Sequence, residues 1–484
     1  MEARPVDAKM ITRRCIVARL QEISISKYRD LVQENAGALL ILIPADLGSI
    51  STSDAKHLQT LERELLLLAE ETSMPVYFAL ETEELAQIYS DIHSGNAGDQ
   101  AATAVQALMS GATANGFQMV IAGSQAKALG EFQITNVQGH LSGYGIEEQL
   151  PTVAFVAHYD AFGIATGLAE GADSNGSGVI ALLELARLFS KLYTNSRTHA
   201  KYNLVFLLSG GGKFNYQGTK RWIEDNLDSQ DTNLLSDVAY VVCLDTIGQS
   251  DNLYLHVSKP PKEDSAGNVF LQNLREIIGS YYPQLKFEMV HKKINLADDI
   301  LAWEHERFSI KRLPAFTLSH LESHKSPDRE TVLDTRSKVD VKKLRRNIHI
   351  VAEAVARHIY NISSRGDVQL FSKTLDVQEE LVSAWLHHLT EKSRAAQLLH
   401  KDHKLLNNLE ETLNRYLKDV KRSTLKADKR DPEFIFYDGA EYTMSAYNVK
   451  PAIFDLFLAL GIIGYLALVY LAVQVKESFT IGDD

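Results

Sequence analysis

Residues 151–190 decide how this sequence is interpreted: they read PTVAFVAHYDAFG, then a short loop, then GADSNGSGVIALLELARLFS. Residues 151–157 form a short apolar run with β-branched side chains, which predicts a buried strand. From Gly178 onward apolar residues recur at helical spacing, and Ser177 or Asn175 can cap the helix that this spacing indicates. The stretch therefore predicts a strand, a glycine-containing turn and a helix, in that order.

Polar residues stand where the predicted strand ends and where the predicted helix begins. His158 and Asp160 follow the strand, and Asp173 lies in the turn before the helix. Open α/β sheets place their ligand sites at the carboxyl ends of strands. In a metal site of this kind the imidazole binds the metal, the neighbouring carboxylate orients it, and the more distant aspartate binds or bridges. An isolated His-x-Asp is more often an ordinary strand end, so the pattern needs its wider context.

The composition limits the class of protein. A chain of 484 residues that is 45% hydrophobic is long enough for two or three domains with a large core. The formal net charge of −12 argues against nucleic acid as a main partner. Two cysteines, Cys15 and Cys243, provide neither a disulfide framework nor a cysteine metal cluster.

Strands and helices alternate along most of the chain, which predicts an α/β fold with a mixed, mostly parallel sheet flanked by helices. The N-terminal region, 1–125, is α/β in its own right, and 126–365 contains the polar cluster. Region 366–450 is polar and helix-rich. Near its end basic residues interleave with aspartates, which predicts a solvated helix face. These basic residues are Lys418, Lys421, Arg422, Lys426, Lys429 and Arg430.

One segment predicts a membrane anchor. Residues 456–473 read LFLALGIIGYLALVYLAV, without a charge, so we expect a single transmembrane helix over 452–475 and a short tail over 476–484. Residues 1–14 are rich in charge and contain no apolar stretch, so no signal peptide is predicted there. Asn361-Ile362-Ser363 is an N-glycosylation sequon, which favours glycosylation at Asn361 and a luminal ectodomain.

The HYD and GADSNGSG motifs together resemble the zinc aminopeptidase superfamily that also contains the transferrin receptor, glutaminyl cyclase and nicastrin. The resemblance implies the sheet of the zinc aminopeptidase type. It also assigns metal-site positions to residues of this chain. These are His158 at the first histidine with Asp160 beside it, Asp173 at the bridging aspartate, Asp245 in LDTIG, and His324 in LESHKS at the last histidine.

The sequence departs from that family at one decisive place. After the third strand the family has two adjacent glutamates, of which the first is the general base and the second a zinc ligand. The segment SGGGKFNYQGTKRW has Gly212 and Lys213 there instead. Glycine can neither accept a proton nor bind a metal, and an ammonium group opposes binding of a cation. We therefore expect no catalytic residues, metal or cofactor, and we expect Lys213 to pair with Asp173 or Asp245.

Further runs, including HVSKPP, LAWEHERF and RLPAFTLSHLESH, resemble the nicalin-like proteins. The resemblance implies a non-enzymatic protein of the endoplasmic reticulum membrane with a luminal ectodomain. It implies contact with membrane lipid and association with the Nodal modulator protein, a small multi-pass membrane protein, the protein-conducting channel and the ribosome. The implied role is the insertion and assembly of multi-pass membrane proteins, with a link to Nodal signalling.

Two other functions remain open at this stage. A membrane-anchored zinc aminopeptidase-like hydrolase could use a rearranged site in which Glu170 or Glu304 supplies the lost carboxylate. A receptor subunit could recognise membrane-protein substrates through the vestigial pocket. Replacing His158 and Asp245 by alanine distinguishes a receptor from a scaffold, because a scaffold should keep its partners if the fold survives.

Overall fold

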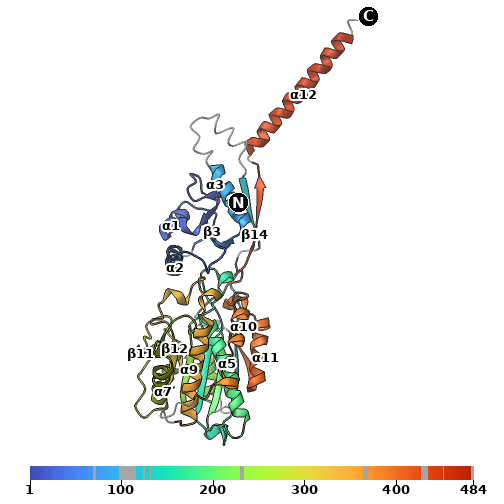
Figure 1. Cartoon of the computed structure of the whole chain (residues 1–484). Coiled ribbons are helices and arrows are strands. Elements are labelled where there is room, and N and C mark those ends of the chain that lie inside the picture. The colour runs from blue at the N-terminus through green and yellow to red at the C-terminus, as the bar shows by residue number, and fades with distance from the viewer. Residues whose placement is uncertain are drawn as a thin grey trace. The chain divides into compact units, whose positions relative to one another are not determined.

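A computed structural model of the chain describes residues 1–68, 72–96, 116–123, 126–130, 132–228, 234–362, 369–426, 434–450 and 452–480. The chain forms two compact units (Figure 1). One consists of Met1–Ser124 with Tyr442–Asp484, and the other of Gln125–Glu441. Region 366–450, which the sequence suggested as separate, is thus divided between the two units.

The second unit is built on an eight-stranded sheet with the strand order β11-β10-β12-β9-β7-β8-β6-β13. Strand β7 at its centre pairs in parallel with β8 and β9, and antiparallel pairs lie towards both edges. Four of the seven strand pairs in this sheet are parallel, which confirms the predicted mixed, mostly parallel sheet. The strands are β6 Gln133–Leu141, β7 Thr152–His158, β8 Asn203–Ser209, β9 Val238–Leu244, β10 Asn252–Val257, β11 Lys286–His291, β12 Ala315–Ser319 and β13 Lys418–Lys426.

Helices cover both faces of this sheet because its central strands are apolar on both sides. Along β7, Val153 and Phe155 belong to one buried cluster with α5, α7 and α9, whereas Ala154 and Val156 belong to another with α6 and α8. Successive strand residues point to opposite faces, so a continuous apolar run requires two covering layers. The helices are α5 Gly176–Thr194, α6 Gln217–Asp228, α7 Ala266–Tyr281, α8 His305–Ile310, α9 Val341–Ile359, α10 Glu379–Thr390 and α11 Lys404–Tyr416.

The basic run near the end of the second unit differs from its prediction. Lys418, Lys421, Arg422 and Lys426 lie on strand β13, which pairs antiparallel with β6, and not on a helix. Arg422 forms an ion pair with Glu410. Pairing with β6 satisfies the backbone of a polar segment whose sequence alone does not favour a strand. Lys429 and Arg430 lie outside the described residues.

The first unit contains a parallel four-stranded sheet with the order β1-β2-β3-β4. A separate antiparallel ribbon joins β5 to β14, from opposite ends of the chain. Its elements are β1 Ala3–Pro5, β2 Cys15–Arg19, α1 Ile25–Gln33, β3 Ala38–Pro44, α2 Thr52–Leu66, β4 Val76–Glu81, α3 Glu83–Asn96, β5 Gly116–Ala122 and β14 Thr443–Val449. The N-terminal region is therefore α/β, as predicted.

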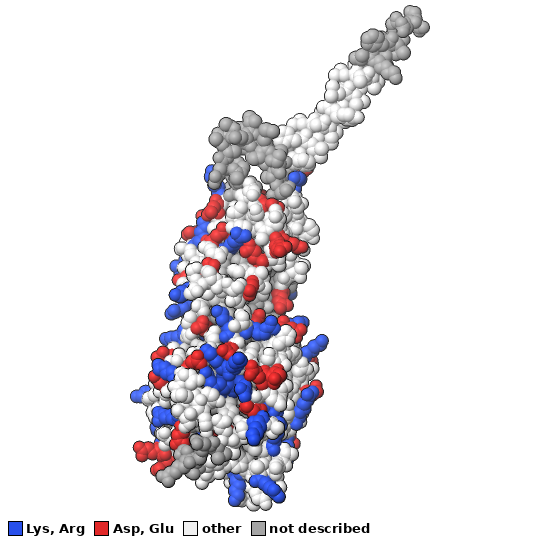
Figure 2. Space-filling model, in the orientation of Figure 1, with Lys and Arg blue, Asp and Glu red and all other residues white. Residues whose placement is uncertain are grey.

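The C-terminal helix α12, Ala452–Thr480, contains the apolar segment Phe454–Gln474. This segment has a mean hydropathy of 2.5 and is not buried in the protein, so its length and composition suit a single membrane span. Figure 2 shows basic and acidic side chains intermingled over the visible face of the other elements, whereas the described part of α12 is almost free of charge.

Candidate functional site

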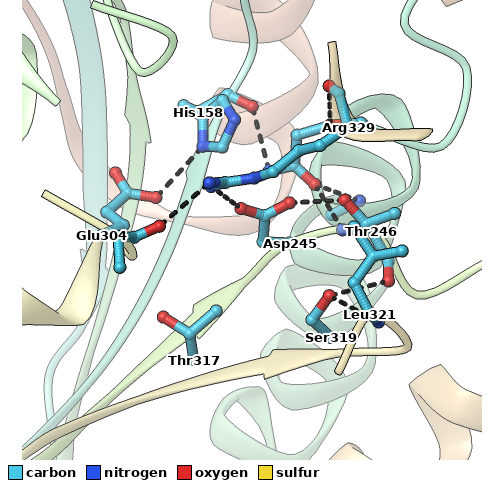
Figure 3. A network of polar contacts seen from close by, with 12 residues as sticks. His158, Asp245, Thr246, Glu304, Thr317, Ser319, Leu321 and Arg329 are labelled. Carbon is cyan, nitrogen blue, oxygen red and sulfur yellow. Dashed lines mark hydrogen bonds and ion pairs between the residues drawn. The ribbon is translucent and has the colours of Figure 1, made fainter. Parts of the chain in front are cut away.

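The polar cluster lies at the carboxyl ends of the central strands. His158 is the last residue of β7, Asp245 follows β9, and His320 follows β12. Because these strands run in parallel, their ends meet at one edge of the sheet. Asp173 reaches the same edge from the turn before α5, and Arg329 from the short 3-10 helix Pro327–Arg329. Figure 3 shows how His158, Glu304, Asp245 and Arg329 converge.

His158 is oriented by Glu304 and not by Asp160. The Nδ1 atom of His158 lies 3.3 Å from Oε2 of Glu304, and both side chains are fully buried. The other oxygen of Glu304 accepts hydrogen bonds from Ser209 (2.8 Å) and Thr219 (2.6 Å). Asp160 accepts the backbone N–H groups of residues 212 and 213 instead, and so fixes that turn.

Asp245 is paired with a cation from the protein itself. Nη2 of Arg329 lies 2.7 Å from Oδ2 of Asp245, and Thr246 donates to Oδ1 over 2.5 Å. Arg329 also donates to Tyr216, and its guanidinium lies 4.6 Å from the ring centroid of Trp303. Burial raises the pKa of Asp245, but the charges of Arg329, His158 and Lys213 lower it by a larger amount, so the net pKa is well below the usual value.

Asp173 is held by a histidine that the sequence analysis did not select. His320 Nε2 lies 2.9 Å from Oδ2 of Asp173, and the backbone N–H of Gly248 donates to Oδ1 over 2.7 Å. Burial lowers the pKa of His320, but Asp173 raises it more, and the net pKa is above the usual value. His324, the predicted last histidine, is half-buried beside Trp303, with ring centroids 6.5 Å apart.

The rule that site residues lie at the carboxyl ends of strands, which selected His158, selects His320 as well. His320 directly follows a buried apolar strand, β12, exactly as a strand-end site residue should, whereas His324 lies four residues further along. The family motif instead assigned the last histidine of the site to His324. The structure brings His158, Asp173 and Asp245 to one edge of the sheet, and it adds Arg329, Glu304 and His320 to them.

Lys213 does not form the predicted ion pair with Asp173 or Asp245. Its Nζ donates to Oγ of Ser174 over 2.5 Å and to the backbone oxygen of Arg329 over 3.0 Å. Burial, together with the nearby charge of Arg329, lowers the pKa of Lys213. The prediction of a lysine partner was therefore wrong, because Arg329 and His320 already occupy the two carboxylates.

Gly212 occupies a position where no side chain fits. A Cβ atom added there would lie 2.2 Å from both Cβ and Cγ of His158. Such a distance is far below van der Waals contact, so a glutamate at this position would require the turn or the strand to move. Glycine is thus a packing requirement of this site, in addition to lacking the chemistry of a glutamate.

The residues of this site do not fit the two-zinc centre that the resemblance implies. A metal needs deprotonated ligands that are free to coordinate it. Here Asp245 binds Arg329, and Asp173 binds His320. Among the described residues, no group of three or more His, Cys, Asp or Glu side chains is arranged to hold a metal ion.

Neither candidate for a replacement carboxylate changes this conclusion. Glu170 accepts the backbone N–H of Arg336 over 3.0 Å, and burial raises its pKa. Glu304 does reach His158, but its two oxygens are engaged by His158, Ser209 and Thr219. The Nε2 atom of His158 is buried and has no hydrogen-bond partner within the described residues.

Asn175-Gly176-Ser177 also fits the sequon pattern, and the two sequons differ in accessibility. Asn361 is exposed just after α9, although Ser363 of its sequon lies outside the described residues. Asn175 is fully buried, and its amide donates to the backbone oxygens of His158 and Leu244. A glycan on Asn175 is incompatible with this packing, so glycosylation at Asn361 remains the prediction.

Comparison with known proteins places this fold in a family. The profile of Peptidase family M28 matches residues 136–355. A Danio rerio protein named "BOS complex subunit ncln" is 54% identical over 492 residues, which cover 98% of this chain and 86% of that protein. The Caenorhabditis elegans protein named "Nicalin" is 31% identical over 480 residues, covering 95% and 83%.

A solved structure agrees in fold. The crystal structure of the gamma-secretase component nicastrin matches with a TM-score of 0.59 over 93% of this chain and 95% of that one, at 11% sequence identity. The identity to nicastrin is too low to indicate more than the fold, whereas the two sequence relatives extend over nearly the whole chain. The chain therefore belongs to the nicalin family, and its fold is similar to that of nicastrin.

Proposed function

We propose that this chain is a non-enzymatic subunit of a membrane protein complex, anchored by α12. The observation that carries the proposal is the buried Arg329–Asp245 ion pair. The resemblance assigns Asp245 as a metal ligand, and here its carboxylate binds an arginine of the same chain. A relative with 54% identity is named as a subunit of the BOS complex, which supports the role as a complex subunit.

The chemistry of the site supports a structural role. A peptidase needs a general base for its water, and losing one costs about a hundredfold or more in rate. Gly212 and Lys213 stand at the positions of the paired glutamates, and Gly212 has no room for a side chain. The polar residues that remain form hydrogen bonds and ion pairs with one another, so they stabilise the edge of the sheet instead of facing a substrate.

The finer parts of the proposal rest on the family resemblance. We place the chain in the endoplasmic reticulum membrane with a luminal, glycosylated ectodomain. Its proposed partners are the Nodal modulator protein, a small multi-pass membrane protein, the protein-conducting channel and the ribosome. The proposed role is support of multi-pass membrane protein insertion and assembly, and a link to Nodal signalling.

The test is to purify the full chain from membranes in mild detergent and identify the co-purifying proteins by mass spectrometry. A matched control replaces 454–474 by an unrelated transmembrane helix. We expect other membrane proteins and translocon components with the natural chain. Recovery of the chain alone from gently solubilised membranes would contradict the proposal.

Elemental analysis of the same preparation tests the non-enzymatic part. After purification with zinc and without chelator, we expect less than about a tenth of an equivalent of zinc, because the described part of the chain contains no free ligand set. One or two equivalents would contradict the argument from Arg329 and would revive the zinc hydrolase with a rearranged site.

A further inference from the structure

The ribbon formed by β5 and β14 is regular and ends close to the membrane anchor. Seven residue pairs join the two strands without a register shift, from Thr443–Ala122 to Val449–Gly116. Within the described part of the chain, β14 pairs with β5 only. Two residues separate the end of β14 from α12, so Val449 and Ala452 are three residue steps apart and can lie at most about 11 Å from each other.

The hydrogen bonds of β5 reveal which backbone groups of β14 face outward. Met119 exchanges two backbone hydrogen bonds with Met1, over 2.7 and 2.8 Å. Its N–H and C=O therefore point away from β14, so Met119 and Ala446 form a non-hydrogen-bonded antiparallel pair. The backbone of Ala446 must then point to the free edge, and by alternation so must those of Met444 and Asn448.

This free edge lacks the features that usually protect one. Neither β5 (GFQMVIA) nor β14 (TMSAYNV) contains a charged residue or a proline. By contrast, edge strand β13 (KDVKRSTLK) carries five charged residues and a register shift. Proteins protect exposed edges with charges, prolines and bulges because an unprotected edge is a template for another strand.

The exposed face of the ribbon is uncharged and carries three exposed apolar residues beside the polar Gln118, Thr443 and Ser445. Val120, Tyr447 and Val449 are 44%, 57% and 43% exposed, and Tyr447 and Val449 alternate along β14. In a sheet, side chains on neighbouring strands contact each other in cross-strand pairs. A strand added beside β14 would therefore place its own alternate side chains next to Tyr447 and Val449, which favours uncharged β-branched or aromatic residues.

We propose that β14 receives an extended strand from a second membrane-anchored protein, which adds to the ribbon immediately outside the bilayer. Strand addition of this kind derives its binding energy from main-chain hydrogen bonds. Three outward-facing residues offer few such bonds, and each has a modest net effect. A partner held in the same membrane can bind despite this weak attraction, because its effective concentration near β14 is high. The inference rests on the proposed role as a complex subunit and assigns a surface to it.

Amide hydrogen exchange at single-residue resolution tests the assignment. It compares the full chain in its complex, purified from membranes, with the full chain separated from its partners in the same detergent. We expect the amides of Met444, Ala446 and Asn448 to exchange at least about tenfold more slowly in the complex. The alternate amides of β14 already bond to β5 and should change little. Equal exchange in both samples, or uniform slowing of all seven residues, would refute strand addition.

A matched pair of variants at one position provides the second test. Asn448→Pro removes an outward N–H but leaves the ladder with β5 intact, whereas Asn448→Thr keeps the N–H and favours a strand. We expect the proline variant to recover the membrane partner at least about tenfold less well, and the threonine variant to recover it normally. Equal unfolding midpoints of the two variants would show that both are folded, and equal recovery would contradict the proposal.

The outcomes separate this inference from the proposed function. If membrane partners co-purify but the β14 amides are unchanged, the strand-addition surface is wrong and the role as a subunit stands. If no membrane partner co-purifies, the proposed function fails and the inference fails with it. If native mass measurement shows that the protection arises in a dimer of this chain alone, the occupant is a second copy and the assignment to another protein is wrong.

Discussion

Arg329 and Asp245 form a buried ion pair with 2.7 Å between Nη2 and Oδ2, although 84 residues separate them in the chain. The guanidinium group remains charged at every pH that the protein tolerates. It therefore neutralises Asp245 permanently. In a metal centre the positive charge that neutralises the aspartate would depend on metal supply. Here Arg329 provides that charge as part of the fold.

Removing the guanidinium should destabilise the protein strongly. Arg329→Ala leaves Asp245 buried and unpaired, which we expect to lower the free energy of unfolding by about 3–5 kcal/mol. Denaturant unfolding of the full chain in detergent measures this. Arg415→Ala, which breaks an exposed pair with Glu411, is the control and should cost less than about 1 kcal/mol. Similar losses in both variants would show that the buried pair has no special role.

A methyl group at Gly212 should also be costly. Gly212→Ala places Cβ 2.2 Å from His158, and such overpacking typically costs about 1–3 kcal/mol or more. Gly279→Ala, in α7, is the matched control because nothing lies within 4 Å of its added Cβ. The control should be neutral or slightly stabilising, since alanine favours a helix. The comparison uses thermal unfolding midpoints, and a stable Gly212→Ala variant would contradict the tight packing.

Three histidines should each destabilise the fold on mild acidification. Burial lowers the pKa of His256 and His324 to about 4 and that of His305 to about 3, from an ordinary value of 6.5. Between these values the unfolded chain binds protons at these histidines that the folded chain does not, so their contribution to stability decreases as the pH falls from about 6.5 to about 4. The raised pKa values of His320 and Asp334 act in the opposite direction. The difference in unfolding midpoint between the natural chain and a variant that lacks one of these histidines, measured across this range at constant ionic strength, should show the decrease.

His256 allows this pH effect to be assigned to one residue. Its ring stacks on Trp303 with centroids 4.2 Å apart, and its Nε2 lies 2.8 Å from the backbone oxygen of Leu321. His256→Phe keeps a ring there but cannot be protonated. We expect it to reduce the slope of stability against pH by roughly 1.4 kcal/mol per pH unit within the range. An unchanged slope would exclude His256 as a contributor.

Glycosylation provides a test of topology. If the ectodomain is luminal, the exposed Asn361 should carry a glycan, and Asn361→Gln should abolish the gel-mobility shift that glycosidase treatment produces. The buried Asn175 should carry none. An unglycosylated natural chain from secretory-pathway membranes would count against a luminal ectodomain.

Removing His158 should not affect partner binding. His158→Ala deletes a buried side chain whose hydrogen-bond partner is Glu304. A scaffold that binds through other surfaces should retain its membrane partners. Asp245→Ala is less informative alone, because it leaves Arg329 unpaired, so we would combine it with Arg329→Met. Loss of partners from a folded His158→Ala variant would favour the receptor hypothesis.

The sequence by itself determined the features that depend on local pattern. The apolar run before His158 indicates a strand buried on both faces, the spacing after Gly178 indicates a helix, and residues 456–473 indicate a membrane span. Each of these follows from side chains within about twenty residues. The motifs around Asp173 and Gly212 also indicated the family, because motif spacing is a local property.

The tertiary structure alone decided which side chains meet. Glu304 reaches His158 across 146 residues, and His320 reaches Asp173 across 147, which no local pattern encodes. The formation of strand β13 also depends on a contact between distant parts of the chain. Its polar segment becomes a strand only because the edge of β6 supplies hydrogen-bond partners. Long-range pairing depends on where the folded backbone places each group, so the partners of Asp173 and Asp245 were visible only in three dimensions.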